Sequence, residues 1–423
     1  MKNHQLSIER YEAYKDSGIE WICEVPEHWN LYKISQSFDQ IGSGTTPKSG
    51  SDVYYENGTV NWINTGDLND GLLMQCKRKV TNQALREHSL TVYPSGSIVI
   101  AMYGATIGKI SILKIAGCTN QACCVLNESK VLEIRFLFYW FLSKRNFIIS
   151  LSYGGGQPNI SQDTIKSLRV CAPLFSEQKA IARYLDTKTA QIDRKIDLLT
   201  QKATLYSNLK QSLINETVTR GLDKSVAMKD SGVEWLGKVP EHWEVKRVKE
   251  IFDIGRGRVI SQLELIEDGI YPVYSSQTKD NGCLGYLNTF DFEGEYITWT
   301  TDGVNAGTVF LRQGKFNCTN ICGTLKLRSQ KKTLQYLLYF LQVITKHNKR
   351  IDTNGAKIMN NEMALIKIAI PPLSEQKAIA DYLDTKTAQI DQIIQTINTQ
   401  IDKLKELRKI LINDVVTGKI KVI

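Results

Sequence analysis

Two long stretches of the chain repeat apolar residues at alternating spacings of three and four, with polar residues between them. Such spacing, kept over about four heptads, is typical of coiled-coil helices. The apolar positions are Leu185, Ile192, Ile196, Leu199, Ala203, Tyr206 and Leu213 in the first stretch, and Leu383, Ile390, Ile394, Ile397, Ile401, Leu404 and Leu411 in the second. We therefore predict a helix over residues 176–219 and another within residues 373–423. Long helices are not stable alone in water, so we expect an antiparallel pair.

The predicted seam is not uniformly apolar. It is interrupted by Thr189 and Lys210 in the first helix, and by Thr387 and Arg408 in the second. At the start of the two stretches, Ser176 and Ser374 precede acidic residues, a pattern that predicts N-terminal caps.

Short apolar runs separated by Gly, Asn, Asp and Thr occupy the rest of the chain, which is typical of short strands joined by turns. The runs cover residues 60–63, 97–102, 109–113, 296–300 and 308–311, with helix-length apolar segments at 133–142 and 333–341. We predict two α/β (α+β) domains of mixed strands, over residues 30–172 and 244–372.

The sequence repeats itself around these domains. Residues 176–193 return at 374–391 with one change, Arg183 to Asp381, and residues 15–29 return at 229–243 with Val-Pro-Glu-His-Trp intact. The order is cyclic, because one copy of the shorter segment follows the first helix and the other stands at the N-terminus. We expect two equal units with a pseudo-two-fold relation, in which three conserved segments, 1–29, 173–243 and 373–423, hold the two divergent domains.

Composition narrows the class of protein. A chain of 423 residues with 42% hydrophobic and 23% charged residues fits a soluble protein of two or more domains. No apolar run is long enough to span a membrane, and the N-terminus does not read as a signal peptide. Nine cysteines, an odd number, favour a reducing cytoplasm. The net charge of +9 permits nucleic acid as a partner.

Motifs for catalysis and cofactors are weak. The stretch 39–44 imitates a glycine loop for S-adenosylmethionine, but Pro47 follows it and no series of βαβ units follows. The stretch 104–109 resembles a phosphate loop, but it is one residue short and Ile110 replaces the expected Ser or Thr. The cysteines lack Cys-x-x-Cys pairs, and we interpret His28 and His242 as structural. We expect no cofactor, no metal and no catalysis in this chain.

Polar loop residues in both domains fit DNA recognition better. Arg and Lys suit guanine or phosphate, Asn and Gln suit adenine, and Asp suits cytosine. The candidates are Ser43, Thr45, Thr46, Lys48, Asn64, Thr65, Asp67, Lys77, Arg78, Lys79, Asn120, Gln121, Gln157 and Asn159 in the first domain, and Arg256, Arg258, Ser275, Ser276, Gln277, Lys279, Thr300, Thr301, Asp302, Asn305, Asn320 and Lys357 in the second. Two other classes stay open at this point, a self-contained DNA methyltransferase and a coiled-coil protein adaptor.

Taken together, the chain resembles the specificity subunit of Type I restriction-modification systems. The resemblance covers both halves. It is carried by segments 15–29 and 229–243, by residues 42–47 with 62–63 and 67–68, by Gly156 to Ser161, and by two Pro-x-x-Ser-Glu-Gln-Lys-Ala-Ile-Ala segments. The second half departs from it at residues 355–360.

The resemblance implies a non-catalytic subunit with two target-recognition domains, each of which reads one half of an asymmetric bipartite site in double-stranded DNA. It implies that the helices set the spacer and dock two methyltransferase subunits. Two restriction/translocase subunits would join the full complex. S-adenosylmethionine, ATP and Mg would then be bound by these partners, in the cytoplasm and away from any membrane.

Overall fold

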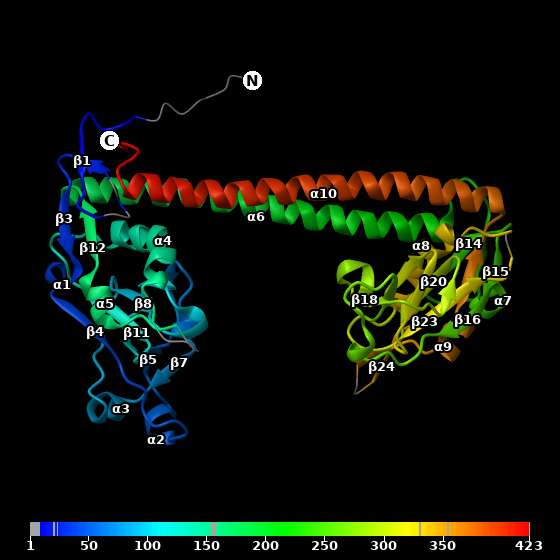
Figure 1. Cartoon of the computed structure of the whole chain (residues 1–423), viewed down its shortest axis with the longest axis horizontal. Coiled ribbons are helices and arrows are strands. Elements are labelled where there is room, and N and C mark those ends of the chain that lie inside the picture. Colours follow the sequence, from blue (N-terminus) through cyan, green and yellow to red (C-terminus); the bar gives the residue numbers. More distant parts are fainter. Residues whose placement is uncertain are drawn as a thin grey trace. The chain divides into compact units, whose positions relative to one another are not determined.

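The computed structural model describes residues 9–19, 22, 24–153, 158–329, 331–352 and 355–422. The chain divides into two compact units: unit 1 is Met1–Leu199 with Thr399–Ile423, and unit 2 is Thr200–Asn398. Both boundaries fall inside the long helices α6 (Phe175–Arg220) and α10 (Leu373–Val416) (Figure 1). Each unit therefore contains one α/β domain, one Trp-Pro-His-Trp segment and part of each long helix.

The α/β domain of unit 1 is built on two sheets, with strand orders β4-β11-β8-β9-β6 and β10-β5-β7. Two further ladders, β1-β2 and β12-β3, lie at its chain ends. The strands are β1 (Tyr14–Asp16), β2 (Glu24–Pro26), β3 (Asn30–Lys33), β4 (Gln40–Ser43), β5 (Val60–Ile63), β6 (Leu72–Leu73), β7 (Arg78–Val80), β8 (Ile98–Ala101), β9 (Ile110–Leu113), β10 (Cys118–Thr119), β11 (Cys123–Asn127) and β12 (Arg169–Ala172). The helices are α1 (Ile34–Ser37), α2 (Asp52–Tyr55), α3 (Asn82–Glu87), α4 (Ile134–Ser150) and α5 (Gln162–Ser167), with 3-10 turns η1 (Thr65–Asp67) and η2 (Gly104–Thr106).

Unit 2 has sheets with strand orders β16-β23-β20-β21 and β18-β17-β22-β19, and the ladders β13-β14, β15-β26 and β24-β25. Its strands are β13 (Met228–Asp230), β14 (Lys238–Pro240), β15 (Glu244–Arg247), β16 (Phe252–Arg256), β17 (Tyr271–Tyr274), β18 (Cys283–Leu287), β19 (Phe292–Glu293), β20 (Tyr296–Thr300), β21 (Val309–Arg312), β22 (Lys315–Cys318), β23 (Cys322–Leu327), β24 (Arg350–Asp352), β25 (Gly355–Lys357) and β26 (Lys367–Ile370). The helices are α7 (Val248–Ile251), α8 (Leu334–His347) and α9 (Asn360–Leu365), with η3 (Gln262–Glu264) and η4 (Lys279–Gly282).

The two domains share the topology of their central strands despite their divergent sequences, while β6 extends the main sheet of unit 1 and β19 extends the smaller sheet of unit 2. In unit 1, β5 pairs in parallel with β10 and antiparallel with β7; in unit 2, β17 pairs in parallel with β22 and antiparallel with β18. The main sheets match likewise, because β11 lies between β4 and β8 as β23 lies between β16 and β20. The strands predicted at 60–63 and 296–300 are β5 and β20, and the prediction of mixed α/β domains is confirmed.

Strand β8 is buried on both faces, which explains its unbroken apolar sequence. Ile98 and Ile100 face a core that also contains helix α4, while Val99 and Ala101 face a second, smaller core. Helix α4 lies between the sheets and the long helices of its unit (Figure 1), and its Phe136 to Phe141 are all buried. Helix α8 occupies the same place in unit 2.

The long helices run antiparallel within each unit (Figure 1), and the residues that interrupt their apolar seam have specific partners. Arg408 Nε lies 3.0 Å from Asp193 Oδ1 in unit 1, and Lys210 Nζ lies 2.6 Å from Asp391 Oδ2 in unit 2. The two pairs occupy equivalent positions of the repeat. Among the described residues, no helix is both long and apolar enough to cross a membrane.

The two threonines of the seam bind the α/β domains instead. Tyr139 of α4 donates to Asp186 at 2.7 Å and lies 3.2 Å from the hydroxyl of Thr189. Tyr339 of α8 repeats this with Asp384 at 2.6 Å and Thr387 at 3.2 Å. Burial is the first cause that raises the pKa of Tyr339, to about 12, so it remains a hydrogen-bond donor at neutral pH.

The repeated Ser-Glu-Gln segment joins each long helix to its domain. The helices begin at Phe175 and Leu373, one residue before the serines, because the carbonyls of Leu174 and Pro372 already accept the first helical hydrogen bonds. The predicted serine caps are therefore wrong. The following glutamates bind the histidines of the other repeated segment, with Nε2–Oε2 distances of 2.9 Å for His28–Glu177 and 2.8 Å for His242–Glu375.

The glutamine of the segment is buried and saturated with backbone hydrogen bonds. Gln178 accepts from Glu133 N at 2.7 Å and donates to the carbonyls of Val131 and Pro173 at 2.8 and 2.9 Å. In unit 2, Gln376 accepts from Thr333 N at 3.0 Å and donates to Pro371 at 2.8 Å. Each glutamine thereby fixes the start of the domain helix relative to the start of the long helix.

Replacing Gln376 with Leu is expected to lower the free energy of unfolding by about 2–4 kcal/mol, because an unpaired buried polar group costs about 1–3 kcal/mol. Urea denaturation measures this difference. The neighbouring exposed residue provides the control, since Lys377→Ala should change the free energy by less than about 0.5 kcal/mol. Equal stabilities for the two variants would contradict a structural role for the amide.

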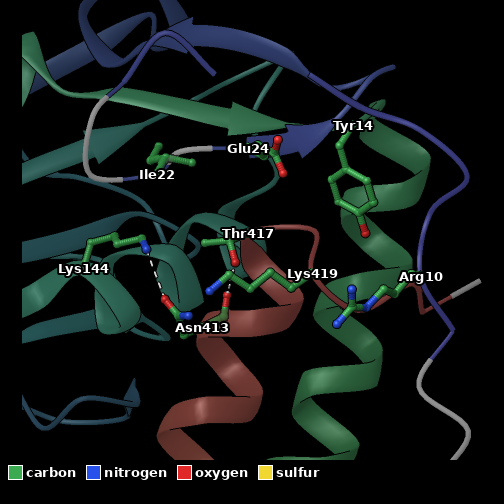
Figure 2. A pocket seen from close by; sticks show the side chains of 8 residues that line it. All are labelled: Arg10, Tyr14, Ile22, Glu24, Lys144, Asn413, Thr417 and Lys419. Carbon is green, nitrogen blue, oxygen red and sulfur yellow. Dashed lines mark hydrogen bonds between the residues drawn. The ribbon is translucent and has the colours of Figure 1, made fainter. Parts of the chain in front are cut away.

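The first and last described stretches of the chain meet in unit 1. Lys421 N donates to Glu9 O at 2.8 Å, and Tyr14 Oη donates to Gly418 O at 3.1 Å. In unit 2 the corresponding place is crossed by continuous chain, from the end of α6 to β13. Beside the meeting point lies a hollow of about 770 Å³, lined by Arg10, Tyr14, Ile22, Glu24, Lys144, Asn413, Thr417 and Lys419 (Figure 2). Its lining residues come from the N-terminal and C-terminal conserved segments and from α4. The hollow therefore lies where these segments meet, and none of the described candidate DNA-binding residues lines it.

Candidate nucleic-acid interface

A tight turn between two strands gathers the candidate residues of the first domain. Asn120 and Gln121 form the turn from β10 to β11, and Asn120 N donates to Ile63 O at the end of β5 at 3.2 Å. The hydroxyl of Thr46 donates to the Gln121 side chain. Gly44 lies so close to Thr119 O that a Cβ would collide with it. The ends of β4, β5 and β10 are thus brought to one place.

Around this turn, backbone and side-chain hydrogen bonds fix the loops. Asp67 accepts from Asn64 N at 2.9 Å and from Lys77 N at 3.3 Å, which ties the turn after β5 to the chain that enters β7. Thr65 lies between them in η1. Thr45 donates to His88 O at 3.3 Å, and Ser43 donates to Gln162 Oε1 at 3.4 Å.

Among the described residues of the first domain, two amide oxygens lack a hydrogen-bond partner. Within the described part of the chain, Oδ1 of Asn120 and Oδ1 of Asn159 are buried without a hydrogen-bond partner. Asn159 also pairs through its backbone with Tyr103 and Tyr153. Buried polar groups are usually paired, so these two oxygens are candidate acceptors for a ligand. Gln157, predicted beside them, lies outside the described residues.

A basic strip runs along one edge of the same domain. Lys77, Arg78 and Lys79 are all exposed, and Arg78 and Lys79 line a hollow of about 520 Å³ with Ser49, Gly50, Ser51, Asp52 and Tyr55. Exposed Lys48 precedes these residues in the chain. In Figure 1, the neighbouring helices α2 and α3 lie on the side of unit 1 farthest from α6.

The second domain builds the same turn, with a cation, Arg256, beside it. Arg256 Nε donates to Asn320 O at 2.6 Å, and Gly257 packs against Cys318 and Thr319 as Gly44 packs against Thr119. Arg256 therefore occupies the place of Ser43. Arg258 is held by two carboxylates, Glu264 at 3.0 Å and Asp291 at 3.1 Å, and the hydrogen bond that it donates to Glu264 is the first cause that raises its pKa.

Most other candidates of the second domain lie around this turn. Thr319 donates to Ser275 at 3.3 Å, and Asn305 Nδ2 donates to Ser276 O at 2.9 Å. Lys357 Nζ lies 3.8 Å from Asp302 Oδ2. Gln277 instead binds Cys283 O in the loop of exposed Lys279.

Thr300 and Thr301 face inward. Their exposed fractions are 2% and 0%, and the Thr301 hydroxyl donates to Ile321 O at 3.1 Å. Neither side chain reaches the surface in this structure. We therefore assign both threonines to the support of the loop that follows them.

Three supporting side chains were not among the sequence candidates. Gln162 and Asn360 open helices α5 and α9 and donate to Ile41 O and Gly255 O at 3.3 and 3.0 Å, which locks β4 and β16 in equivalent ways. Arg312 is buried, with its guanidinium 3.6 Å from the Tyr274 ring centre and 2.7 Å from Asn281 O. Burial lowers the pKa of Arg312, and its electrostatic interaction with Tyr274 offsets part of this lowering. Gln162 and Asn360 could have been found from the sequence, because each is an amide residue at the first position of a short helix.

A family model described as the Type I restriction modification DNA specificity domain matches residues 26–203 and again residues 240–403. The two matches together cover well over half of the chain. The chain belongs to this family. Each match begins in a Val-Pro-Glu-His-Trp segment, passes through one α/β domain and ends within a long helix. The family domain is therefore present twice, and the duplication seen in the sequence is a duplication of this domain.

Relatives agree with this membership. The Type I restriction enzyme MjaVIII specificity subunit of Methanocaldococcus jannaschii is 24% identical over 97% of this chain and 98% of its own length. The Type I restriction enzyme MpnII specificity subunit of Mycoplasma pneumoniae is 38% identical over 40% of this chain and 49% of its own. A solved structure from work on complex assembly and conformational transition of the type I R-M system has the same fold, with a TM-score of 0.74 at 16% identity, over 93% of this chain and 98% of the other.

Proposed function

We propose that this chain selects the DNA sequence for a Type I restriction-modification complex, and that each α/β domain contacts one half of an asymmetric bipartite site. The observation that carries the proposal is the pair of equivalent turns at Asn120 and Asn320, which have unlike side chains around them: Ser43 and Thr46 in one domain, Arg256 in the other. One framework with two sets of polar groups suits a protein that reads two different short sequences.

The partners follow from the family. We propose that methyltransferase subunits dock on the long helices and bring S-adenosylmethionine, and that restriction subunits bring ATP and Mg. The near-identity of residues 176–193 and 374–391 supports two equivalent docking surfaces. We propose further that the length of the helices sets the spacer between the half-sites.

Reconstitution with the methyltransferase partner tests the proposal. The complex should bind one bipartite duplex at least about a thousandfold more tightly than a scrambled duplex, and sequencing of methylated DNA should return one asymmetric motif. Binding without sequence preference would overturn it and favour a protein adaptor. Tight S-adenosylmethionine binding and methylation by the isolated chain would favour a self-contained methyltransferase.

Lys77 and Lys79 are proposed to contact phosphates rather than bases. Replacing either with Ala should weaken binding to all duplexes alike and lower the slope of log K against log salt by about one, because each phosphate contact releases about one counterion. Fluorescence anisotropy at several salt concentrations measures the slope. Lys130→Ala, an exposed lysine before α4 in the same domain, is the matched control. An unchanged slope for both variants would show that Lys77 and Lys79 do not contact DNA phosphates.

A further inference from the structure

Two loops in the two domains share a glycine frame. The loop Gly104–Gly108 joins β8 to β9, and the loop Gly303–Gly307 joins β20 to β21. All four glycines have positive φ angles: 67° and 75° in the first loop, 90° and 81° in the second. Residues with a Cβ rarely adopt this conformation, so the glycines are needed for the shape of the loop.

The hydrogen bonds inside the loops are also the same. Gly108 N donates to Ala101 O at 2.9 Å, and Gly307 N donates to Thr300 O at 2.8 Å, so each loop closes on the strand that precedes it. Within the loops, the third residue after the first glycine donates back to that glycine, at 3.1 Å from Ile107 N and 3.0 Å from Ala306 N.

Both loops are fixed to the turns that gather the candidate interface. Met102 N donates to Ala122 O at 2.8 Å, and Thr301 N donates to Ile321 O at 2.9 Å, directly after Asn120–Gln121 and Asn320 respectively. On the other side, Ile160 N donates to Met102 O and Ile358 N donates to Thr301 O, each at 2.9 Å. Backbone hydrogen bonds therefore hold each loop beside its turn, and in the second domain the Thr301 hydroxyl adds a bond to Ile321 O.

The side chains on this common frame differ. Tyr103 is replaced by Asp302, Ala105 by Val304, and Thr106 by Asn305. Val304 is 97% exposed, although it is apolar and its backbone is fixed on both sides. Ala105 is exposed as well, and the other four residues are half-buried. The shared frame is made by glycines and backbone groups, so it is kept while the residues at the three positions differ. In the second loop, Asp302 and Asn305 additionally contact Lys357 and Ser276 O.

We propose that these two loops read bases, and that residues 103, 105 and 106 in one domain and 302, 304 and 305 in the other determine the base preference of their own half-sites. This inference rests on the proposed function. The chemistry of the side chains fits base edges. A valine suits the methyl group of thymine, Asn suits adenine, and Asp accepts from the amino group of cytosine.

The test uses the full chain with its methyltransferase partner, and DNA methylation motifs as the readout. Val304→Ala and Asn305→Ala should each change the preference at one or two base positions of one half-site by about fivefold or more, and leave the other half-site unchanged. The double variant Ala105→Val with Thr106→Asn should change the opposite half-site only. Ile270→Ala is the matched control, since Ile270 is exposed and precedes β17, at the opposite end of that strand from Ser275.

Three outcomes separate the possibilities. A change confined to one half-site supports the inference. Wild-type motif and affinity in all three loop variants would overturn it, while the proposed function would stand because the wild-type complex still selects its site. A wild-type complex without any sequence preference would overturn the proposed function and this inference together.

Discussion

Replacing residues 30–172 with the equivalent domain of a relative is expected to change one half of the methylated DNA site completely and to leave the other half as it was. The structure explains why the exchange should fold. At the junction with α6, Gln178 binds the backbone N–H of Glu133 and the backbone carbonyl of Val131, which any sequence provides. Among the side-chain contacts that the new domain should keep are Tyr139, which binds Asp186, and Lys144, which binds Asn413.

Sequencing of methylated DNA from the reconstituted complex measures the outcome. The exchange of residues 244–372 is the reciprocal experiment and should change the other half. A chimaera that folds and methylates DNA, but whose motif changes in both halves, would show that the domains do not read independently. Thermal unfolding of each chimaera establishes that the replaced domain is folded.

Replacing Trp243 with Ala is expected to lower the free energy of unfolding by about 3–5 kcal/mol, the usual cost of removing a buried indole. Its ring is fully buried against Tyr336, at a right angle with 6.4 Å between ring centres, and its Nε1 donates to Glu375 at 3.1 Å. The substitution thus removes core packing and a link between the two repeated segments at once.

Two variants separate these contributions in urea denaturation. Trp243→Phe keeps an aromatic ring but loses the bond to Glu375, so a smaller loss of about 1–3 kcal/mol is expected. Trp235→Ala removes the other tryptophan of the same segment, which is only half-buried and stacks on His347, and should cost less than Trp243→Ala. An equal loss of unfolding free energy in Trp235→Ala and Trp243→Ala would contradict the larger contribution that we expect from Trp243.

The elements with strong periodicity could be predicted from the sequence. The heptads of α6 and α10, the strands β5 and β20, and the repeated segments all follow from local patterns. The partners of Thr189 and Lys210 could not, because Tyr139 and Asp391 come from other parts of the chain. These residues read as breaks in a seam, whereas their side chains connect the helices to each other and to the domains.

The loops show a different limit. In the sequence, Gly104 to Lys109 resembles a phosphate loop that lacks one residue of the required spacing. Its two glycines are all that it shares in sequence with Gly303–Gly307. The equivalence lies in backbone hydrogen bonds, which no side-chain pattern reports. The predicted Thr300 and Thr301 precede this loop but point inward, because strand β20 is buried on both faces up to its end and the Thr301 hydroxyl bonds Ile321 O. The exposed residue of this loop is Val304. Because valine is apolar, a search of the sequence for polar candidate residues overlooks it.

The placement of Glu177 and Gln178, repeated at Glu375 and Gln376, has a consequence for evolution. All four lie in the nearly identical segments, and each segment makes the contacts that join a domain to its helix. A genetic crossover between two related genes within residues 176–193 would therefore join the first domain of one to the second domain of the other and keep a segment of the same sequence at the joint. New combinations of half-sites could therefore arise by recombination between genes in a single event.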